Sequence, residues 1–92
     1  MKAIYRYYLD CGRMGSVAGL FVAEMDEVEA LAGKRCYFGE ILGKHSEIGD
    51  NKPRANTVLL SSQQQHVAWF EELGLATGVN PLDFLPEDED ER

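Results

Sequence analysis

The fold is decided by the stretch Ala3–Leu9, AIYRYYL. It is rich in aromatic residues and short, which predicts a β-strand. Because successive side chains of a strand point to opposite faces, the odd-numbered residues that end at Leu9 should share one face. The even-numbered residues from Ile4 to Tyr8 should share the other face.

Outward from this strand, the chain continues with turn signals and a second apolar run. Two glycines in residues 10–16 mark a loop, and Val17–Ala23 then predicts a strand that forms a hairpin with the first. A first helix is expected from Glu24 or Asp26 to Ala32, with its acidic residues in the first turn, where the helix dipole favours them.

The second half of the chain repeats this order. Strands are expected over residues 34–42 and 57–61, separated by a polar loop over residues 50–56. The Ser62–Gln65 tetrapeptide has the form of a capping box and predicts a second helix that ends at Gly74. The predicted order is β-β-α-β-β-α. It favours a two-layer α+β domain, with a mostly antiparallel four-stranded sheet and two helices packed on one face.

Length and charge limit the domain organisation and the kinds of partner that this chain can have. The chain has 92 residues, which suits one compact domain over residues 1–86, followed by an acidic tail over residues 87–92 that we expect to be mobile. The formal net charge is −7 and the basic residues are scattered, with Lys34-Arg35 as the only adjacent pair. Since affinity for phosphate backbones requires clustered Lys and Arg, direct nucleic-acid binding is disfavoured.

The sequence lacks the signals that are typical of exported, membrane-spanning and zinc-binding proteins. The chain has neither a signal-peptide pattern nor an apolar run near 20 residues, which favours a cytoplasmic protein that does not enter a membrane. The two cysteines, Cys11 and Cys36, are expected to be free thiols in that compartment. Cysteine and histidine spacings do not match a zinc site, so no metal or cofactor is expected.

Polar and ionisable side chains are concentrated in a second stretch, Gly39–Gly49, GEILGKHSEIG. Four consecutive residues at its centre carry a cation, an imidazole, a hydroxyl and a carboxylate: Lys44, His45, Ser46 and Glu47. In an extended conformation His45 and Glu47 share one side, where they could support proton transfer or bind a metal. A turn that contacts a partner explains the same residues. A phosphate loop is excluded because the glycine spacing is one residue too short.

Two more residues complete this catalytic hypothesis. Glu40, on the neighbouring strand turn, could be a third group beside His45 and Glu47. Cys11 lies close to Arg13, whose charge would lower the pKa of the thiol, although the preceding acid opposes this effect. A small packing residue in a tight turn is the alternative interpretation of Cys11. Catalytic triads are normally assembled from separated segments, so we lean towards a protein that is not an enzyme.

The leading hypothesis is a small acidic, non-enzymatic binding protein, of an accessory or inhibitor type such as bacteria and phages use. Its partner is expected to be a protein, recognised through the open sheet face and the two glycine-flanked loops at residues 10–16 and 43–49. The expected contact residues are Arg13, Tyr37, Lys44, His45, Ser46 and Glu47. The alternatives are a small enzyme or metal-binding domain centred on His45 and Glu47, and an acidic nucleic-acid mimic. Homodimerisation through a sheet edge also remains open.

Overall fold

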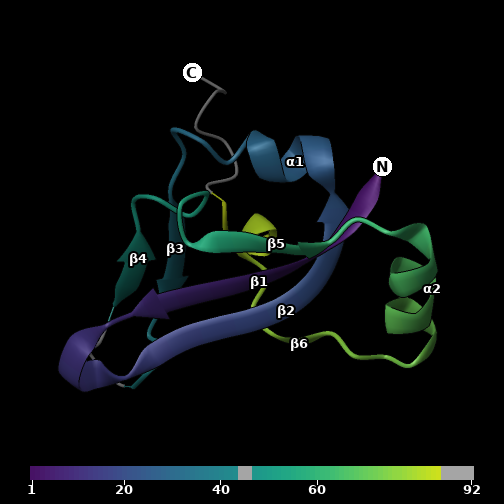
Figure 1. Cartoon of the computed structure of the whole chain (residues 1–92). Coiled ribbons are helices and arrows are strands. Elements are labelled where there is room, and N and C mark those ends of the chain that lie inside the picture. The colour runs from purple at the N-terminus through teal and green to yellow at the C-terminus, as the bar shows by residue number, and fades with distance from the viewer. Residues whose placement is uncertain (44–46, 86–92) are drawn as a thin grey trace.

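The computed structural model describes residues 1–43 and 47–85 (Figure 1). Within these residues the chain forms an α+β fold, which confirms the predicted class. The elements in chain order are β1 (Lys2–Asp10), η1 (Gly12–Met14), β2 (Ser16–Glu24), α1 (Met25–Glu29), β3 (Cys36–Gly39), β4 (Ile48–Asp50), β5 (Thr57–Ser61), α2 (Gln64–Glu72), β6 (Thr77–Gly78) and η2 (Pro81–Phe84).

The β1–β2 hairpin is the centre of the structure. Its antiparallel register runs without interruption from Lys2 opposite Glu24 to Asp10 opposite Ser16. Strand β5 pairs with the other edge of β1, and the short β6 pairs with β2, so the sheet order is β5-β1-β2-β6. The predicted hairpin and the four-stranded antiparallel sheet are both confirmed.

The predicted element order is not confirmed in detail. The strand expected over residues 34–42 is shorter, and it pairs with β4 in a separate two-stranded sheet instead of joining the main sheet. Strands β4 and β6 were not predicted, because two or three residues are too few to show an alternating pattern. Nor does Ser62 cap α2: the residue at the N-cap is Gln63, whose N–H donates to the Ser61 hydroxyl over 3.2 Å.

The main core lies on the odd-numbered face of β1, which we call the core face. Tyr5 stacks on Phe21 with ring centroids 5.9 Å apart, and Tyr7 packs against Phe38 of β3 at 5.8 Å. Helix α1 contributes the fully buried Val28 to this cluster. The β3–β4 sheet, α1 and η2 therefore cover the core face.

Helix α2 lies on the opposite face. Its Val67 and Phe70 pack with the even-numbered Ile4 of β1, and Leu20 and Val22 of β2 border the same cluster. The sequence predicts both helices on one face, whereas the structure places one on each face of the hairpin (Figure 1). The physical reason is that the N-terminal half of β1 is apolar on both faces. Another element must therefore pack on each face there to exclude water.

Strand β6 approaches β2 closely enough to require glycine on both strands. A Cβ atom at Gly19 would lie 1.7 Å from the carbonyl oxygen of Val79, and one at Gly78 would lie 2.1 Å from that of Ala18. Gly78 also has a φ of +72°, in the left-handed region that glycine adopts without a Cβ penalty. Each contact involves backbone atoms, which cannot rotate away as a side chain can.

We predict that Gly78→Ala destabilises the protein more than Gly12→Ala. The two glycines have nearly the same φ, +72° and +66°, but a Cβ at Gly12 meets no described atom within 4 Å. Gly12→Ala should lower the free energy of unfolding by about 1 kcal/mol, the cost of left-handed backbone. Gly78→Ala adds the clash, and should cost at least about 1 kcal/mol more. Urea unfolding of both variants measures the difference, and equal losses would contradict the close approach.

Candidate functional site

A buried carboxylate joins the two sheets. Asp50 of β4 is 4% exposed and accepts three hydrogen bonds. The Tyr7 hydroxyl donates to it over 2.5 Å, the Lys52 N–H over 2.8 Å and the Asn56 side-chain amide over 2.9 Å. Burial, followed by this hydrogen bond and the charge of Asp50, raises the pKa of Tyr7 far above its ordinary value. Because these bonds satisfy the carboxylate, we assign the cluster a structural role.

The two thiols adjoin this cluster and are held in the protonated form. Cys36 of β3 is buried, and its Sγ donates to the Pro81 carbonyl oxygen over 3.2 Å. Burial, and then the charge of Asp50, raises the pKa of Cys36 to about 11. Burial also raises the pKa of Cys11, followed by the charges of Asp10 and Asp50. A lowering of the Cys11 pKa by Arg13 is therefore not what the structure shows, and packing describes this thiol better.

The predicted polar run falls only partly within the described residues. Lys44, His45 and Ser46 lie outside them, so their candidate roles as contacts or as catalyst stay predictions. Glu47 and Glu40 are exposed on either side of the β3–β4 connection. Tyr37 of β3 lies beside both: desolvation, then a hydrogen bond and the charge of Glu47, and then the charge of Glu40 raise its pKa.

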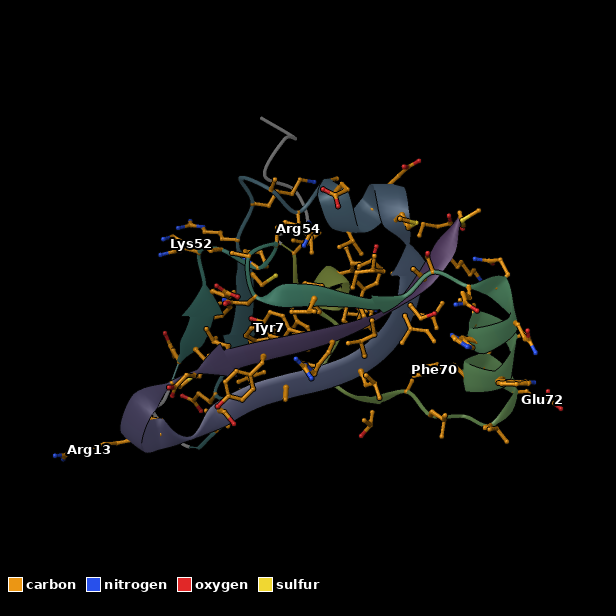
Figure 2. The ribbon with its side chains drawn as sticks, viewed as in Figure 1. Tyr7, Arg13, Lys52, Arg54, Phe70 and Glu72 are labelled. Carbon is orange, nitrogen blue, oxygen red and sulfur yellow. The ribbon has the colours of Figure 1, made fainter. Side chains whose placement is uncertain are left out.

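The loop over residues 10–16 lies beside the turn that follows β3, at one end of the hairpin. A Cβ at Gly15, in the loop after η1, would lie 4.0 Å from Cδ1 of Leu42, so this loop touches the turn that follows β3. Figure 2 shows Arg13 pointing away from the molecule at this tip. We define the loop end as five exposed side chains of the η1 loop, β3 and the β3–β4 connection: Arg13, Met14, Tyr37, Ile41 and Glu47.

A second surface is the part of the even-numbered face beyond the α2 cluster, with Leu20 at the border between the two. Arg6 is the centre of a row across three strands, opposite Val58 of β5 and Leu20 of β2. In the next row towards the loop end, Tyr8 lies opposite Ala18. We define the open face as these five residues. Tyr8 is 51% exposed and Val58 45% exposed, and alternation along Ala3–Leu9 predicts the open positions on β1.

The enzyme or metal-binding alternative stays a prediction, because His45 lies outside the described residues. Over residues 1–43 and 47–85, no group of three or more His, Cys, Asp and Glu side chains is arranged to hold a metal ion. A nucleic-acid mimic needs rows of free carboxylates. Here Asp50 is buried, Glu29 pairs with Arg54 at 2.8 Å and Glu71 with Lys2 at 3.4 Å.

Neither α-helix in the described part of the chain has the length and apolar character needed to cross a lipid bilayer.

Comparison with known proteins does not assign this chain to a family. No protein-family model, no curated protein and no solved structure gives a significant match to this chain. The site must therefore be interpreted from its own chemistry.

We predict that stability falls as pH rises above about 9, and that Cys36 contributes to the fall. The thiol ionises near its ordinary value of 9.0 in the unfolded chain but near 11 in the folded one. Between these values the unfolded state binds fewer protons, so rising pH favours unfolding. Between about pH 8 and pH 10 the wild-type protein should lose about 1 kcal/mol more than Cys36→Ala. Urea unfolding at both pH values tests this, and parallel losses would rule out the Cys36 contribution.

Proposed function

We propose that this protein is a small acidic, non-enzymatic binding protein that recognises another protein through its open face and its adjoining loop end. One observation carries the proposal: Val58, Arg6 and Tyr8 stand exposed on paired strands, on the part of the even-numbered face that α2 leaves uncovered. Whether the protein acts as an inhibitor or as an accessory protein would depend on which partner it binds.

The residue types of the open face favour protein recognition. Tyrosine and arginine are enriched at the centres of protein interfaces, where they supply much of the binding free energy. The five residues include one cation and no carboxylate, although the whole chain has a formal net charge of −7. A partner can therefore cover this surface without burying an unpaired acid of this protein.

The rigidity of the sheet strengthens the proposal. All five side chains project from hydrogen-bonded strands, and Tyr8 is additionally anchored by its N–H, which donates to the carbonyl oxygen of Asn56 over 3.1 Å. Little backbone ordering is then required on binding, which leaves more of the interaction energy as affinity.

Nucleic acid fits the same surface less well. Platforms that stack bases combine several aromatic rings with a positively charged groove. The open face has one ring, Tyr8, and one cation, Arg6. The acidic chain as a whole would repel a phosphate backbone.

The loop end extends this surface towards the hairpin tip. Tyr8 lies two residues before the Asp10–Ser16 connection, so Arg13 and Met14 continue the open face along the chain. Tyr37, which is 56% exposed, and its neighbour Glu47 lie on the other side of the hairpin, on the sheet that covers the core face. They form a separate polar part of the loop end.

The test is capture of a protein from lysate of the source cells, followed by titration of the purified partner. Tyr8→Ser/Val58→Ser should raise the Kd by at least about 30-fold, since two interface side chains of this kind each contribute about 1 kcal/mol or more. The matched control is Leu73→Ser/Leu75→Ser, which removes two exposed apolar side chains outside the open face. It should leave the Kd within about threefold. A partner lost with the control and kept by the open-face variant would overturn the proposal.

A further inference from the structure

Strand β2 is paired on both edges over only part of its length. Its ladder with β1 covers all of Ser16–Glu24. Its ladder with β6 covers Gly19 and Leu20, and the Val79 N–H adds one bond to the Ala18 carbonyl oxygen over 3.0 Å. Among the described residues no strand pairs with the outer edge of β2 over residues 21–24.

The free edge presents backbone groups in a defined direction. The carbonyl of Ala18 points towards β6. Residues two apart on a strand direct their amide groups to the same side, so Leu20 and Val22 point the same way as Ala18. Leu20 meets β6, whereas Val22 lies beyond the end of that strand. The N–H and C=O of Val22 are therefore in place to pair with an added strand.

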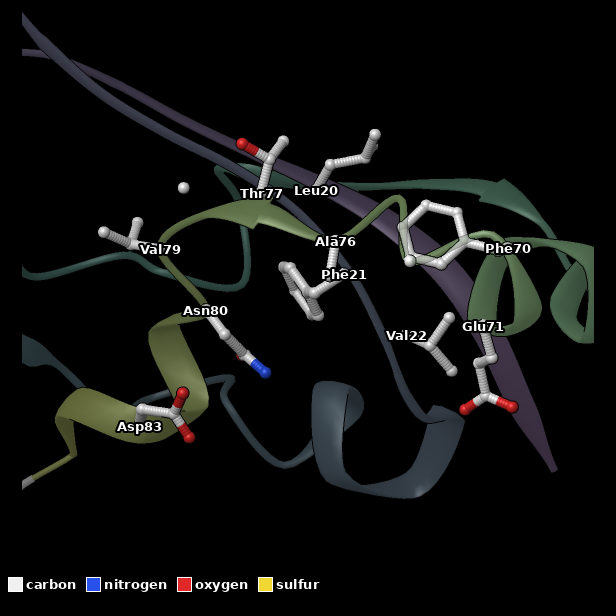
Figure 3. Close-up of a pocket in the computed structure, with 12 residues that line it drawn as sticks. Leu20, Phe21, Val22, Phe70, Glu71, Ala76, Thr77, Val79, Asn80 and Asp83 are labelled. Atoms are coloured by element: carbon white, nitrogen blue, oxygen red, sulfur yellow. The ribbon is translucent and has the colours of Figure 1, made fainter.

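Two hollows make this edge accessible. One of about 520 Å³ lies between β2, α2 and the segment from β6 to η2, and includes Phe21 and Phe70 in its lining. A second of about 500 Å³ lies between β2, α1 and η2. Both are lined by Val22, Asn80 and Asp83, so together they form one groove along the free edge. Figure 3 shows Asn80 and Asp83 on the η2 side of the first hollow.

The groove has an apolar floor and a partly acidic border. In the first hollow Glu71 and Asp83 are the charged lining residues, and no basic side chain of the described chain lines it. Lys2 reaches Glu71 at 3.4 Å, whereas Asp83 forms no ion pair among the described residues. In the second hollow Glu24 and Glu27 are joined by Lys2 and Lys34. A ligand with one or two cations therefore fits the first hollow best.

We propose that this groove binds an extended, basic segment of a partner protein, which adds to the edge of β2 as a strand. The unpaired backbone of Val22 would supply main-chain hydrogen bonds, Phe21 and Phe70 would pack against apolar side chains, and Asp83 would pair with a Lys or Arg of the peptide. This site lies on the opposite edge of the sheet from β5, so it goes beyond the open face proposed above.

A second copy of this chain is a weaker occupant. In the main sheet a second copy could offer the edge strand β5, where the Arg54 side chain already donates to the Thr57 carbonyl oxygen over 2.9 Å. The register of β5 also shifts between Ser61 and Leu59, an irregularity that protects edges from further pairing. Two chains of formal net charge −7 would in addition repel each other.

The test titrates the full-length protein with labelled hexapeptides in which Lys alternates with Val, Leu or Phe. At least one should bind saturably, and Asp83→Asn should weaken it by at least about threefold, as loss of a charge pair predicts. Asp26→Asn, an acid on α1 that lines neither hollow, is the matched control and should leave binding unchanged. Methylating alternate backbone nitrogens of the peptide should weaken binding at least about tenfold, because it removes strand hydrogen bonds.

Amide chemical shifts locate the site independently of affinity. Binding should shift the amide signals of Phe21–Glu24 and slow hydrogen exchange at Val22. Equal binding of a Glu-containing peptide or of the methylated peptide would overturn the proposal, as would shifts confined to β5. Failure of all three basic peptides to bind at millimolar concentration would also overturn it. None of these results would decide the test of the open face, which substitutes Tyr8 and Val58.

Discussion

The hydrogen bond from Tyr7 to Asp50 is the interaction on which the arrangement of this fold depends. It joins the central strand β1 to β4, across 43 positions of sequence. The same carboxylate orders the chain that leads to β5, because it accepts from Lys52 and Asn56, and the Asn56 carbonyl oxygen in turn accepts from Tyr8. One buried acid therefore positions both the second sheet and the edge strand of the first.

This bond also contributes to which face of the hairpin stays exposed. Since Tyr7 lies on the core face, the β3–β4 sheet docks there together with α1 and η2. The even-numbered face keeps only α2, which covers the end near Ile4 and leaves Arg6 and Tyr8 exposed. The position of the open face therefore follows from the position of the Tyr7–Asp50 hydrogen bond on the core face.

Much of the fold could be predicted from local patterns, and the failures have identifiable causes. Alternation in Ala3–Leu9 predicts the two faces of β1, and the glycines of residues 10–16 before Val17–Ala23 predict the hairpin, because both are local patterns. Residues 50–56 are predicted as an exposed polar loop, since composition cannot show that Asp50 faces a tyrosine far away in the sequence. The placement of α2 opposite α1 likewise depends on which face of β1 each helix meets.

The residues of the candidate site could likewise be predicted only in part from the sequence. The glycine-flanked loops predict Arg13 and Glu47 as contacts, and the aromatic strands predict Tyr37; the structure brings Tyr37 and Glu47 side by side. The Cys11 thiol was harder to predict, because burial raises its pKa and a linear sequence shows only its charged neighbours. The groove along β2 could not be predicted at all, since segments far apart in the sequence form its walls.

A double-mutant cycle on Tyr7 and Asp50 tests the central claim most directly. Tyr7→Phe, Asp50→Asn and the double variant would be compared with the wild-type protein by urea unfolding, with Trp69 fluorescence as the signal. Because the bond is buried and its acceptor charged, the double variant should lose about 1.5–3 kcal/mol less stability than the sum of the single losses. Losses that add within about 0.5 kcal/mol would show that the two side chains do not stabilise one another, and would contradict the account.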